Sequence, residues 1–309
     1  MLVLKTERLR LRWFVPEDAP HVLAQLTEPS WIVNIRDSGV RDLPAARAWM
    51  EEKLFAGYWS SGLGLWAVER ASDGVLLGMC GLLQRDYLPA PDIGYAFLPR
   101  YWGQGYAREA AAACMAYAQN VLGQTRLYAT TAVDNTPSQN VLLSIGFLYQ
   151  EDLLLDGHDG VTRMFSWGGR STERSDESQI KDMLQRFYRA FDNRDGRVPN
   201  VTALPFWMLG RAVIHFGDER GDLAGLDLPT FMRQRAELLG PQGAWREYEE
   251  SVSTKRLELQ GRVAHVWLRC RKSWLDQGHV QHREGVKSIQ LVKQGSHWKI
   301  AALAWEDRL

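Results

Sequence analysis

Along residues 1–168 the apolar positions switch repeatedly between a two-residue and a 3.6-residue period. Strand patterns occupy 8–14, 65–70, 75–83, 93–98, 127–133, 153–155 and 161–165. Helical patterns begin at Pro16, cover 44–58 behind a capping Asp42, run onward from Gly105 to about Val121, and cover 137–145. Ser72-Asp73-Gly74 marks a hairpin turn between two of the strands. The first half is therefore expected to be a mixed α/β domain.

The second half places its helical patterns first and its strand patterns last. An amphipathic stripe covers 180–191, and a second helix is expected over 228–239. From Trp245 onward the pattern predicts four long strands, broken by turn signals at 260–261, 276–278 and 294–296. Within one strand, alternate apolar residues predict a single buried face, and Trp267 is out of phase with them. This order predicts an α+β domain with a curved antiparallel sheet.

A polar segment with paired glycines, GGRSTERSDES at 168–178, separates the halves and has the composition of a linker. We therefore expect domains at 1–168 and 178–309, joined by a linker at 169–177. Residues 1–168 hold 14 Lys/Arg against 18 Asp/Glu, and 169–309 hold 23 against 19, so the whole chain is neutral. Neutrality disfavours a strongly basic nucleic-acid binder and an acidic disordered chain.

Cysteine usage and the hydropathy pattern predict the compartment. Cys80, Cys114 and Cys270 are widely spaced and form no CxxC pair, which disfavours both a disulfide scaffold and a cysteine zinc site. His21 and His158 are isolated, so no metal is implied. The first residues carry charges within their apolar run, and no stretch reaches the roughly 18 apolar residues of a membrane span. We expect a soluble cytoplasmic protein.

The segment 92–118 carries the clearest chemical signal. A strand leads into Pro99, then a glycine-containing turn, then an alanine-rich helix. The unpaired N–H groups of a helix start form an anion site, and Gly103 and Gly105 allow a phosphate to approach the backbone. An ordinary glycine turn would produce the same pattern. A dinucleotide fingerprint is disfavoured, because Arg108 occupies the last glycine position of GxGxxG.

Three motifs in order add a resemblance. TERLRLR (6–12) with PEDA (16–19), GYAFLPRYWGQGYAREA (94–110) and DNTPSQNVLLSIGF (134–147) resemble the GNAT N-acetyltransferase superfamily, in its ribosomal-protein-alanine acetyltransferase branch. The resemblance implies the mixed-sheet acyl-CoA N-acyltransferase fold over residues 1–168. The family's pyrophosphate motif, Gln/Arg-x-x-Gly-x-Gly/Ala, fits both 100–105 and 102–107. The distance from Pro99 favours the second register, with Trp102 in the first place.

The resemblance also implies acetyl-CoA as cosubstrate and a set of residues that bind it. Asn135 matches an asparagine that binds the cofactor arm, a role compatible with capping a helix. The strand backbone at 95–97 would pair with the pantetheine, and the glycine turn would hold the pyrophosphate. These cofactor residues are Tyr95, Ala96, Phe97, Trp102, Gly103, Gln104, Gly105, Tyr106, Ala107, Arg108 and Asn135.

The chemistry implied is direct attack of an amine on the thioester in a ternary complex. Asp92 is the leading candidate for the base and Asp152 its competitor, although either could be a surface acid and a base could act through water. Leu142 stands where many relatives have a tyrosine that acts as the general acid. Ser138 resembles a serine placed near the sulfur, and a local hydrogen bond explains it equally well.

The acceptor is expected near the segment 28–43, interpreted as a loop between the first two helices. Trp31 and Arg36 are candidate acceptor contacts, and Trp31 is also explained as a core anchor. The acceptor itself would be a small-molecule or peptide amine. Neither nucleic acid nor membrane is expected as a partner.

The second half resembles the nuclear-transport-factor-2-like fold, which includes SnoaL-type cyclases. That resemblance implies a cone-shaped domain with a pocket that dimerises through its sheet. Tyr188 matches a tyrosine of the steroid isomerases, but Phe216 stands in the place of their aspartate, which argues against that activity. His215, Arg269 and Arg283 are candidate pocket residues, or simply paired sheet residues.

These observations predict an acetyl-CoA-dependent N-acetyltransferase that acts on a primary amine, with a C-terminal binding module that makes a homodimer. The alternative is a non-catalytic acyl-CoA-binding sensor whose C-terminal domain holds a small-molecule pocket. Both bind the cofactor, so only turnover with amines separates them.

Overall fold

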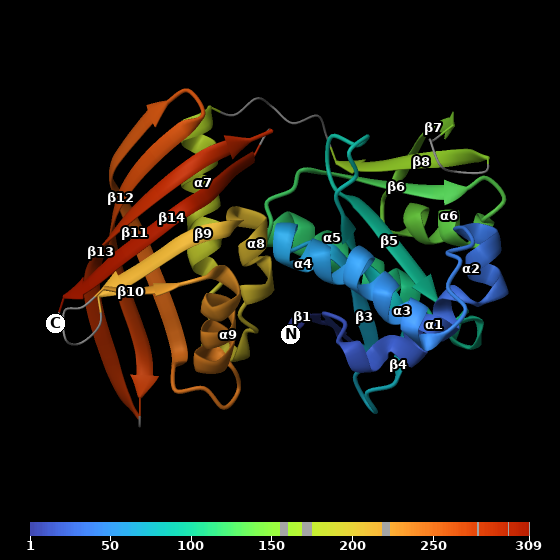
Figure 1. Cartoon of the computed structure of the whole chain (residues 1–309), viewed down its shortest axis with the longest axis horizontal. Helices are drawn as coiled ribbons and strands as arrows, with labels where there is room; N and C mark the ends of the chain where they lie inside the picture. The colour runs from blue at the N-terminus through green and yellow to red at the C-terminus, as the bar shows by residue number, and fades with distance from the viewer. Residues whose placement is uncertain (155–159, 169–174, 218–222, 277, 296, 309) are drawn as a thin grey trace. The chain divides into compact units, whose positions relative to one another are not determined.

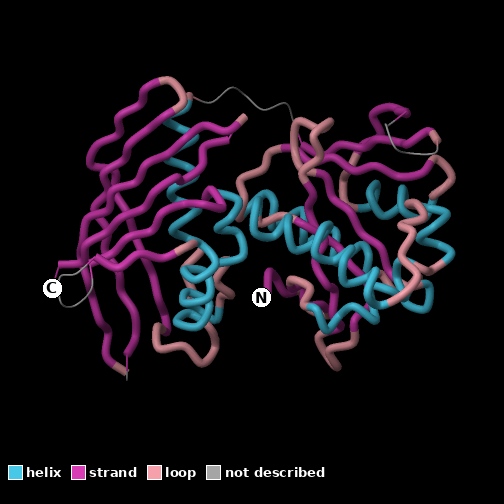
Figure 2. Tube along the Cα trace, in the orientation of Figure 1, coloured by secondary structure: helices cyan, strands magenta, loops and turns pink. Residues whose placement is uncertain are grey.

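The computed structural model describes residues 1–154, 160–168, 175–217, 223–276, 278–295 and 297–308 (Figure 2). Internal contacts divide the chain into two compact units, residues 1–58 with 63–172 and residues 59–62 with 173–309. Of the predicted linker 169–177, residues 169–174 lie outside the described residues. Asp176 and Glu177 are not linker, because they form the first turn of a helix capped by the Ser175 side chain.

The first unit is built on an eight-stranded mixed sheet in the order β1-β2-β3-β4-β5-β6-β8-β7 (Figure 1). All neighbours are antiparallel except β5 and β6, which confirms the predicted mixed sheet. The strands are β1 (Leu2–Lys5), β2 (Leu9–Arg12), β3 (Gly64–Arg70), β4 (Leu76–Leu83), β5 (Asp92–Phe97), β6 (Arg126–Ala132), β7 (Leu148–Leu154) and β8 (Val161–Gly168).

The helices of this unit follow the predicted order, with one addition. They are η1 (Pro16–Asp18), α1 (Ala19–Leu26), α2 (Pro29–Asn34), α3 (Leu43–Met50), a π-helical stretch η2 (Glu51–Phe55), α4 (Ala56–Ser61), η3 (Pro99–Tyr101), α5 (Tyr106–Asn120) and α6 (Thr136–Ser144). Asp42 caps α3 by accepting from the Ala45 N–H at 2.8 Å, as predicted. The interpretation of 28–43 as a loop is wrong at α2, where Pro29 suits a first helical turn and Trp31 is buried.

Two packing features position the site. Helix α5 buries a face of small residues, including Ala110, Ala111 and Cys114, so it lies close to the sheet. Strands β5 and β6 share one parallel register pair, Asp92 with Tyr128. Beyond that pair the ladder between these two described strands stops, and both strands line a cavity described below.

The second unit has a six-stranded sheet in the order β10-β9-β14-β13-β12-β11. Figure 1 shows its helices gathered on one side of that sheet. The elements are α7 (Asp176–Arg189), η4 (Arg194–Gly196), η5 (Val201–Ala203), α8 (Leu204–Trp207), β9 (Met208–Gly217), β10 (Leu223–Leu226), α9 (Leu228–Leu239), β11 (Arg246–Gln260), β12 (Val263–Asp276), β13 (His279–Gln294) and β14 (His297–Arg308).

The predicted antiparallel sheet is confirmed for the four long strands β11 to β14, but one pair of the sheet differs. Strands β14 and β9 run parallel, with Ile300 opposite Met208 and Leu303 opposite Ile214. The chain crosses from β10 to the far edge of the sheet through α9 and returns by three antiparallel hairpins. The returning β14 therefore runs in the same direction as β9.

Burial along β12 separates the two faces of this sheet. Val266, Leu268 and Cys270 are buried, whereas Trp267 is 41% exposed, as its phase predicts. His215 and Arg269 occupy the same exposed alternation and are paired with neighbouring strands, which favours the interpretation as paired sheet residues over that as pocket residues.

Arg283 is also exposed, and its guanidinium lies over the Trp274 ring. A small cavity of about 10 Å³ is lined by Phe187, Tyr188, Phe191, Phe231, Arg235, Tyr248, Glu250, Lys287, Leu303 and Trp305.

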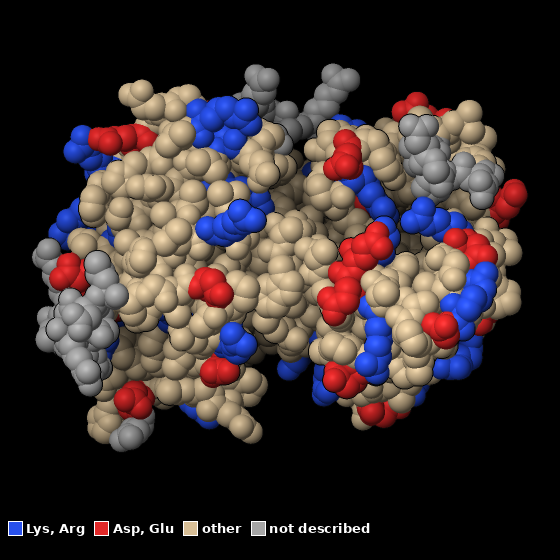
Figure 3. Space-filling view, in the orientation of Figure 1, with Lys and Arg blue, Asp and Glu red and all other residues tan. Residues whose placement is uncertain are grey.

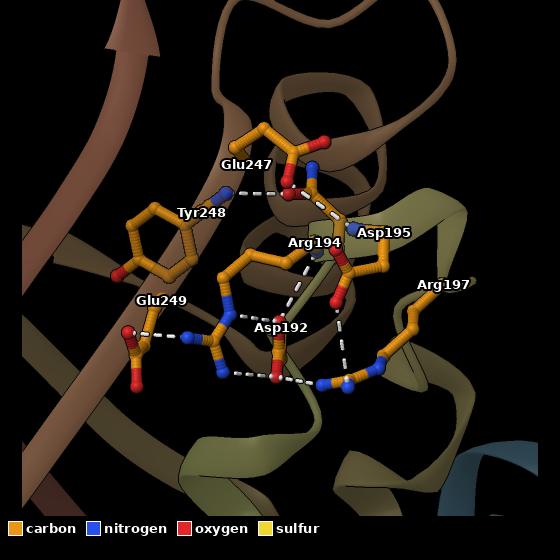
Figure 4. A network of polar contacts seen from close by, with 8 residues as sticks. Asp192, Arg194, Asp195, Arg197, Glu247, Tyr248 and Glu249 are labelled. Atoms are coloured by element: carbon orange, nitrogen blue, oxygen red, sulfur yellow. Dashed lines mark hydrogen bonds and ion pairs between the residues drawn. The ribbon is translucent and has the colours of Figure 1, made fainter. Parts of the chain in front are cut away.

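A polar network connects the end of α7 to the start of β11 (Figure 4). Arg194 donates to Asp192 at 2.9–3.0 Å and to Glu249 at 2.6 Å. Asp195 and Glu247 both have left-handed backbones, with φ of 53° and 49°, and the Asp195 N–H donates to the Glu247 carboxylate at 3.2 Å. The network therefore holds two residues that are strained in this conformation.

On the face drawn in Figure 3, Lys and Arg side chains are interspersed with Asp and Glu. None of the described helices is both long enough and apolar enough to span a bilayer.

Candidate active site

The turn before α5 exposes backbone N–H groups. Gly103 and Gly105 have φ of 73° and 79°, a left-handed conformation that side chains disfavour. Gly105 is the N-cap of α5 and supplies no side-chain cap. A Cβ at Gly103 would meet nothing within 4 Å, and one at Gly105 would meet only the Arg8 guanidinium at 3.4 Å. A helix start of this kind suits a pyrophosphate.

The turn opens into a cavity of about 520 Å³. Most of the predicted cofactor residues line it, namely Tyr95, Ala96, Phe97, Trp102, Gly103, Gly105, Tyr106, Ala107, Arg108 and Asn135. Gln104 does not, because its side-chain amide is turned back to donate to the Arg100 carbonyl at 3.3 Å. Trp102 lines the cavity and Arg100 does not, which favours the 102–107 register.

A brace behind the turn was missed by the sequence reasoning. Glu109 on α5 accepts from the Thr6 hydroxyl at 2.5 Å and from the Arg8 Nε at 2.6 Å. Arg8 also donates to the Gln104 carbonyl at 3.0 Å, and its guanidinium lies over the Tyr106 ring. The motifs TERLRLR and YAREA contain all three charged or hydroxyl members of this brace, so their joint occurrence was the available signal.

Asn135 occupies the N-cap of α6. Its side-chain oxygen accepts from the Ser138 N–H at 3.1 Å, and the same residue lines the 520 Å³ cavity. The capping role and a cofactor contact are therefore compatible here.

A second cavity of about 950 Å³ lies where β5 and β6 diverge. Its walls come from α2 and the following residues to Asp37, from β5 and β6, and from residues 160–162. Both cavities are lined by Trp31, Tyr95, Ala96 and Ser138. The cofactor-side cavity and this larger one therefore meet at the middle of β5.

Asp92 is a buried carboxylate in the wall of the larger cavity. It is 3% exposed and contacts the Arg85 Nε at 3.3 Å. Burial raises the pKa of Asp92 to about 6, although Arg85 opposes the rise. Arg85 was not singled out from the sequence, since a loop arginine carries no distinctive pattern.

Asp152, the competing base, lies elsewhere. Its carboxylate accepts from the Arg163 Nε at 3.0 Å, and that contact lowers the pKa of Asp152. It lines neither of the two cavities described for this unit. Geometry therefore favours Asp92 of the two candidates.

Two hydroxyls meet at the junction of the cavities. The Tyr95 hydroxyl donates to the Ser138 carbonyl at 2.9 Å and lies 3.0 Å from the Ser138 Oγ. Burial raises the pKa of Tyr95, so it keeps its proton. Leu142 is buried one turn later on α6. The sequence had suggested only the backbone of Tyr95 as functional.

The two predicted acceptor contacts differ in burial. Trp31 is 7% exposed and packs edge-on against Trp49, yet it lines both cavities, so it is at once a core residue and a wall. Arg36 is exposed at the larger cavity, and its guanidinium has no ion pair among the described residues.

Burial lowers the pKa of His21 to about 4, and His158 lies outside the described residues. Within the described ranges, no group of three or more His, Cys, Asp and Glu side chains could hold a metal ion.

Comparison with known proteins agrees with this geometry. Residues 8–148 match the family model described as an acetyltransferase (GNAT) domain. The chain is 32% identical over 154 residues to Bacillus subtilis YkkB, covering 48% of this chain and 87% of that protein. It is 28% identical over 148 residues to the B. subtilis N-acetyltransferase YoaA, covering 47% and 82%.

Among solved structures, a GNAT-family acetyltransferase from Bacillus anthracis aligns with a TM-score of 0.47 and 23% identity, covering 54% of this chain and 98% of that one. The match to the family model and the identity to YkkB decide the family. Through its first unit the chain belongs to the GNAT acetyltransferases, and it is an acetyl-CoA-dependent acyltransferase.

Proposed function

We propose that the protein transfers the acetyl group of acetyl-CoA to a primary amine by direct attack within a ternary complex. The observation that carries this proposal is the meeting of two cavities at β5, with a helix-start anion site in one and the buried Asp92 in the other. Two substrates bound in the two cavities can meet there.

On the cofactor side, the N–H groups at residues 103–108 would bind the pyrophosphate, and the brace of Thr6, Arg8 and Glu109 would keep the turn in place. The free edge of β5 at residues 95–97 would hydrogen-bond the pantetheine amides. Asn135 would add a contact to the cofactor arm while it caps α6.

On the acceptor side, Asp92 is the proposed base. An amine attacks only after it has lost its ammonium proton, and Asp92 can take that proton directly or through a water. Its pKa near 6 leaves it ionised at neutral pH. That pKa is also nearer to the pKa of an ammonium group than the pKa of an exposed aspartate is.

The reaction then forms a C–N bond and breaks the C–S bond of the thioester, and the attacking nitrogen loses its surplus proton to water to give the neutral amide. Backbone N–H groups of β5 would polarise the carbonyl. The departing thiolate would take a proton from the Ser138 hydroxyl, which regains one from solvent. Tyr95 would act as a positioning residue, because its hydroxyl contacts both Ser138 oxygens.

The experiment that tests this function is turnover of acetyl-CoA with a panel of amines, followed by release of the free thiol. Acetylated product from at least one amine is expected. Tight acetyl-CoA binding without turnover of any amine would instead support the acyl-CoA sensor. The motif likeness to ribosomal-protein-alanine acetyltransferases places peptides with a free N-terminus in the panel.

For the second unit we propose a nuclear-transport-factor-2-like module, spanning about 178–309, that dimerises through the exposed face of its sheet. Trp267, Val213 and Val263 support this, because they are 41–56% exposed and aromatic residues are enriched in interfaces. Light scattering of the full chain should give a dimer, and Trp267→Glu should give a monomer. A wild-type monomer at micromolar concentration would refute the proposal. Cytoplasmic location is part of the same proposal.

A further inference from the structure

We infer that the acceptor is a small molecule with a single amino group on a bulky apolar body. This inference rests on the proposed function and names the substrate class of its acceptor site. It comes from the 950 Å³ cavity, whose lining combines exposed aliphatic side chains with few carboxylates that are free of a cation.

The mouth of that cavity is apolar. Helix α2 and the residue after it place Ile32, Val33 and Ile35 in its wall, and they are 37%, 79% and 42% exposed. Val161 of β8 also lines it and is 46% exposed. Exposing large aliphatic side chains to water is unfavourable in free energy. A ligand that covers them gains that free energy, whereas a strongly hydrated ligand does not.

The interior continues the same character. Leu65, Leu83, Ile93, Val133 and Leu142 line the cavity, together with one side of Trp31. A volume of this size exceeds what a minimal amine fills. An aromatic ring or a branched aliphatic body would use the walls that a short polar amine leaves uncovered.

The charged lining argues against a polyamine. Three aspartates line the cavity, Asp37, Asp92 and Asp134, against two arginines, Arg36 and Arg85. Asp37 is held by Arg41 at 2.5 and 2.9 Å, and Asp92 contacts Arg85 at 3.3 Å. Of the three, only Asp134 has no ion pair among the described residues. An acceptor with three or four ammonium groups would therefore find a single carboxylate without an ion pair, Asp134, and an unpaired arginine, Arg36, in the same lining.

The single buried carboxylate Asp92 can accept a proton from one amino group at a time. Asp92 is the most buried of the three aspartates, and it stands on β5 three residues before Tyr95, where the strand reaches the junction of the cavities. An amine placed there would have its apolar body directed along the wall toward the mouth.

The test compares kcat/KM, by thiol release, for four acceptors on the full chain. They are phenethylamine, spermidine, glycinamide and a tetrapeptide with an N-terminal alanine. We expect phenethylamine to exceed each of the others by at least tenfold. A preference for spermidine, glycinamide or the peptide by a similar margin would overturn the inference while leaving the proposed acetyl transfer intact. If neither these four acceptors nor a wider panel of amines is acetylated, the proposed function itself is refuted.

Two variants sharpen the result. Val33→Asn should raise the KM for phenethylamine about fivefold with kcat within twofold, because it replaces an exposed aliphatic wall. Val75→Asn is the matched control, since Val75 is also exposed but follows the hairpin turn before β4. Arg36→Glu should raise kcat/KM for spermidine by several fold. An unchanged KM in Val33→Asn would contradict the apolar mouth.

Discussion

The two units bury charged side chains in opposite ways. In the first unit Asp92 faces a cavity of about 950 Å³, and its carboxylate contacts a half-exposed Arg85 at 3.3 Å. In the second unit Glu250 pairs with Lys287 at 2.5 Å, and Asp307 pairs with Lys272 at 2.7 Å. The cavity beside the Glu250–Lys287 pair is about 10 Å³, room for about one water.

The difference decides which carboxylate can carry out chemistry. Burial raises the pKa of Asp92 more than Arg85 lowers it, so its ionised form is poorly stabilised and takes up a proton readily. Burial also acts on Glu250, but Lys287 and Lys272 together outweigh it and lower the pKa. A buried charge open to a cavity is therefore available to a substrate, whereas one closed by its own partners stabilises the fold.

The largest expected effect is the loss of activity in Asp92→Asn. Removing a general base should lower kcat by about 10²–10⁴-fold. In the wild type, kcat/KM should rise with pH through about 6, because the base works in its deprotonated form. Steady-state rates across pH 5–8 measure both. Asp152→Asn is the control, and a comparable loss there would reverse the assignment.

The same variant should be more stable than the wild type at neutral pH. A carboxyl whose pKa is raised on folding contributes stability below its unfolded value of about 4, and loses it as pH rises toward 6. Asparagine has no such penalty, so the free energy of unfolding should increase by about 1–3 kcal/mol at pH 7. Urea denaturation at pH 4.5 and 7 should show a clearly larger gain at the higher pH, because at pH 4.5 the raised pKa has cost the wild type only part of this stability.

The second largest effect is expected at the buried Glu250–Lys287 ion pair of the second unit. Lys287→Met leaves Glu250 buried without its nearest cation, which should lower the free energy of unfolding by about 3–5 kcal/mol. Lys287→Met combined with Glu250→Met should recover most of that loss. Arg256→Met, which removes an exposed ion pair with Glu258, is the control and should change little. A small loss in the single Lys287 variant would mean that the cluster is open to water.

These contrasts also explain what the sequence could predict. The periods and caps predicted nearly every strand and helix of the first unit, because such signals are local. Helix α2 escaped, since its six residues are too few for a period to appear. The parallel β14–β9 pair escaped because it depends on where the chain re-enters the sheet.

For the site, the glycine turn and Asn135 were predictable because one contiguous motif contains each of them. The pairing of Tyr95 with Ser138 joins residues 43 apart, and that of Arg8 with Glu109 joins residues 101 apart. No periodicity encodes such contacts. Asp92 was predicted as a base by resemblance, but its burial and its arginine partner are properties of the folded chain.

A third effect should appear at the open backbone of the first unit. Gly105→Glu puts a Cβ and a negative charge at a helix start with a φ of 79°, so acetyl-CoA affinity should fall at least tenfold. Gly74→Glu is a matched control, because Gly74 has a φ of 73° in a hairpin turn with open space around it. Both variants carry similar backbone strain. Calorimetry with acetyl-CoA should show normal binding for Gly74→Glu, and equal affinities for both would mean that the pyrophosphate site is misplaced.

The smallest effect is expected at Tyr95. Like the buried ion pairs of the second unit, its hydroxyl is hydrogen-bonded within the protein, but it lies where the two cavities of the first unit meet. Tyr95→Phe removes the hydrogen bond to the Ser138 carbonyl and should lower the free energy of unfolding by about 1 kcal/mol. If Tyr95 only positions Ser138, kcat should fall about three- to tenfold, KM for acetyl-CoA should stay within twofold, and the pH profile should keep its rise near 6. Ser138→Ala should lower kcat further, and adding Tyr95→Phe to it should cost little more, because the hydroxyl would then have no serine to orient. Fully additive losses in the double variant would show instead that Tyr95 acts on the substrate independently of Ser138.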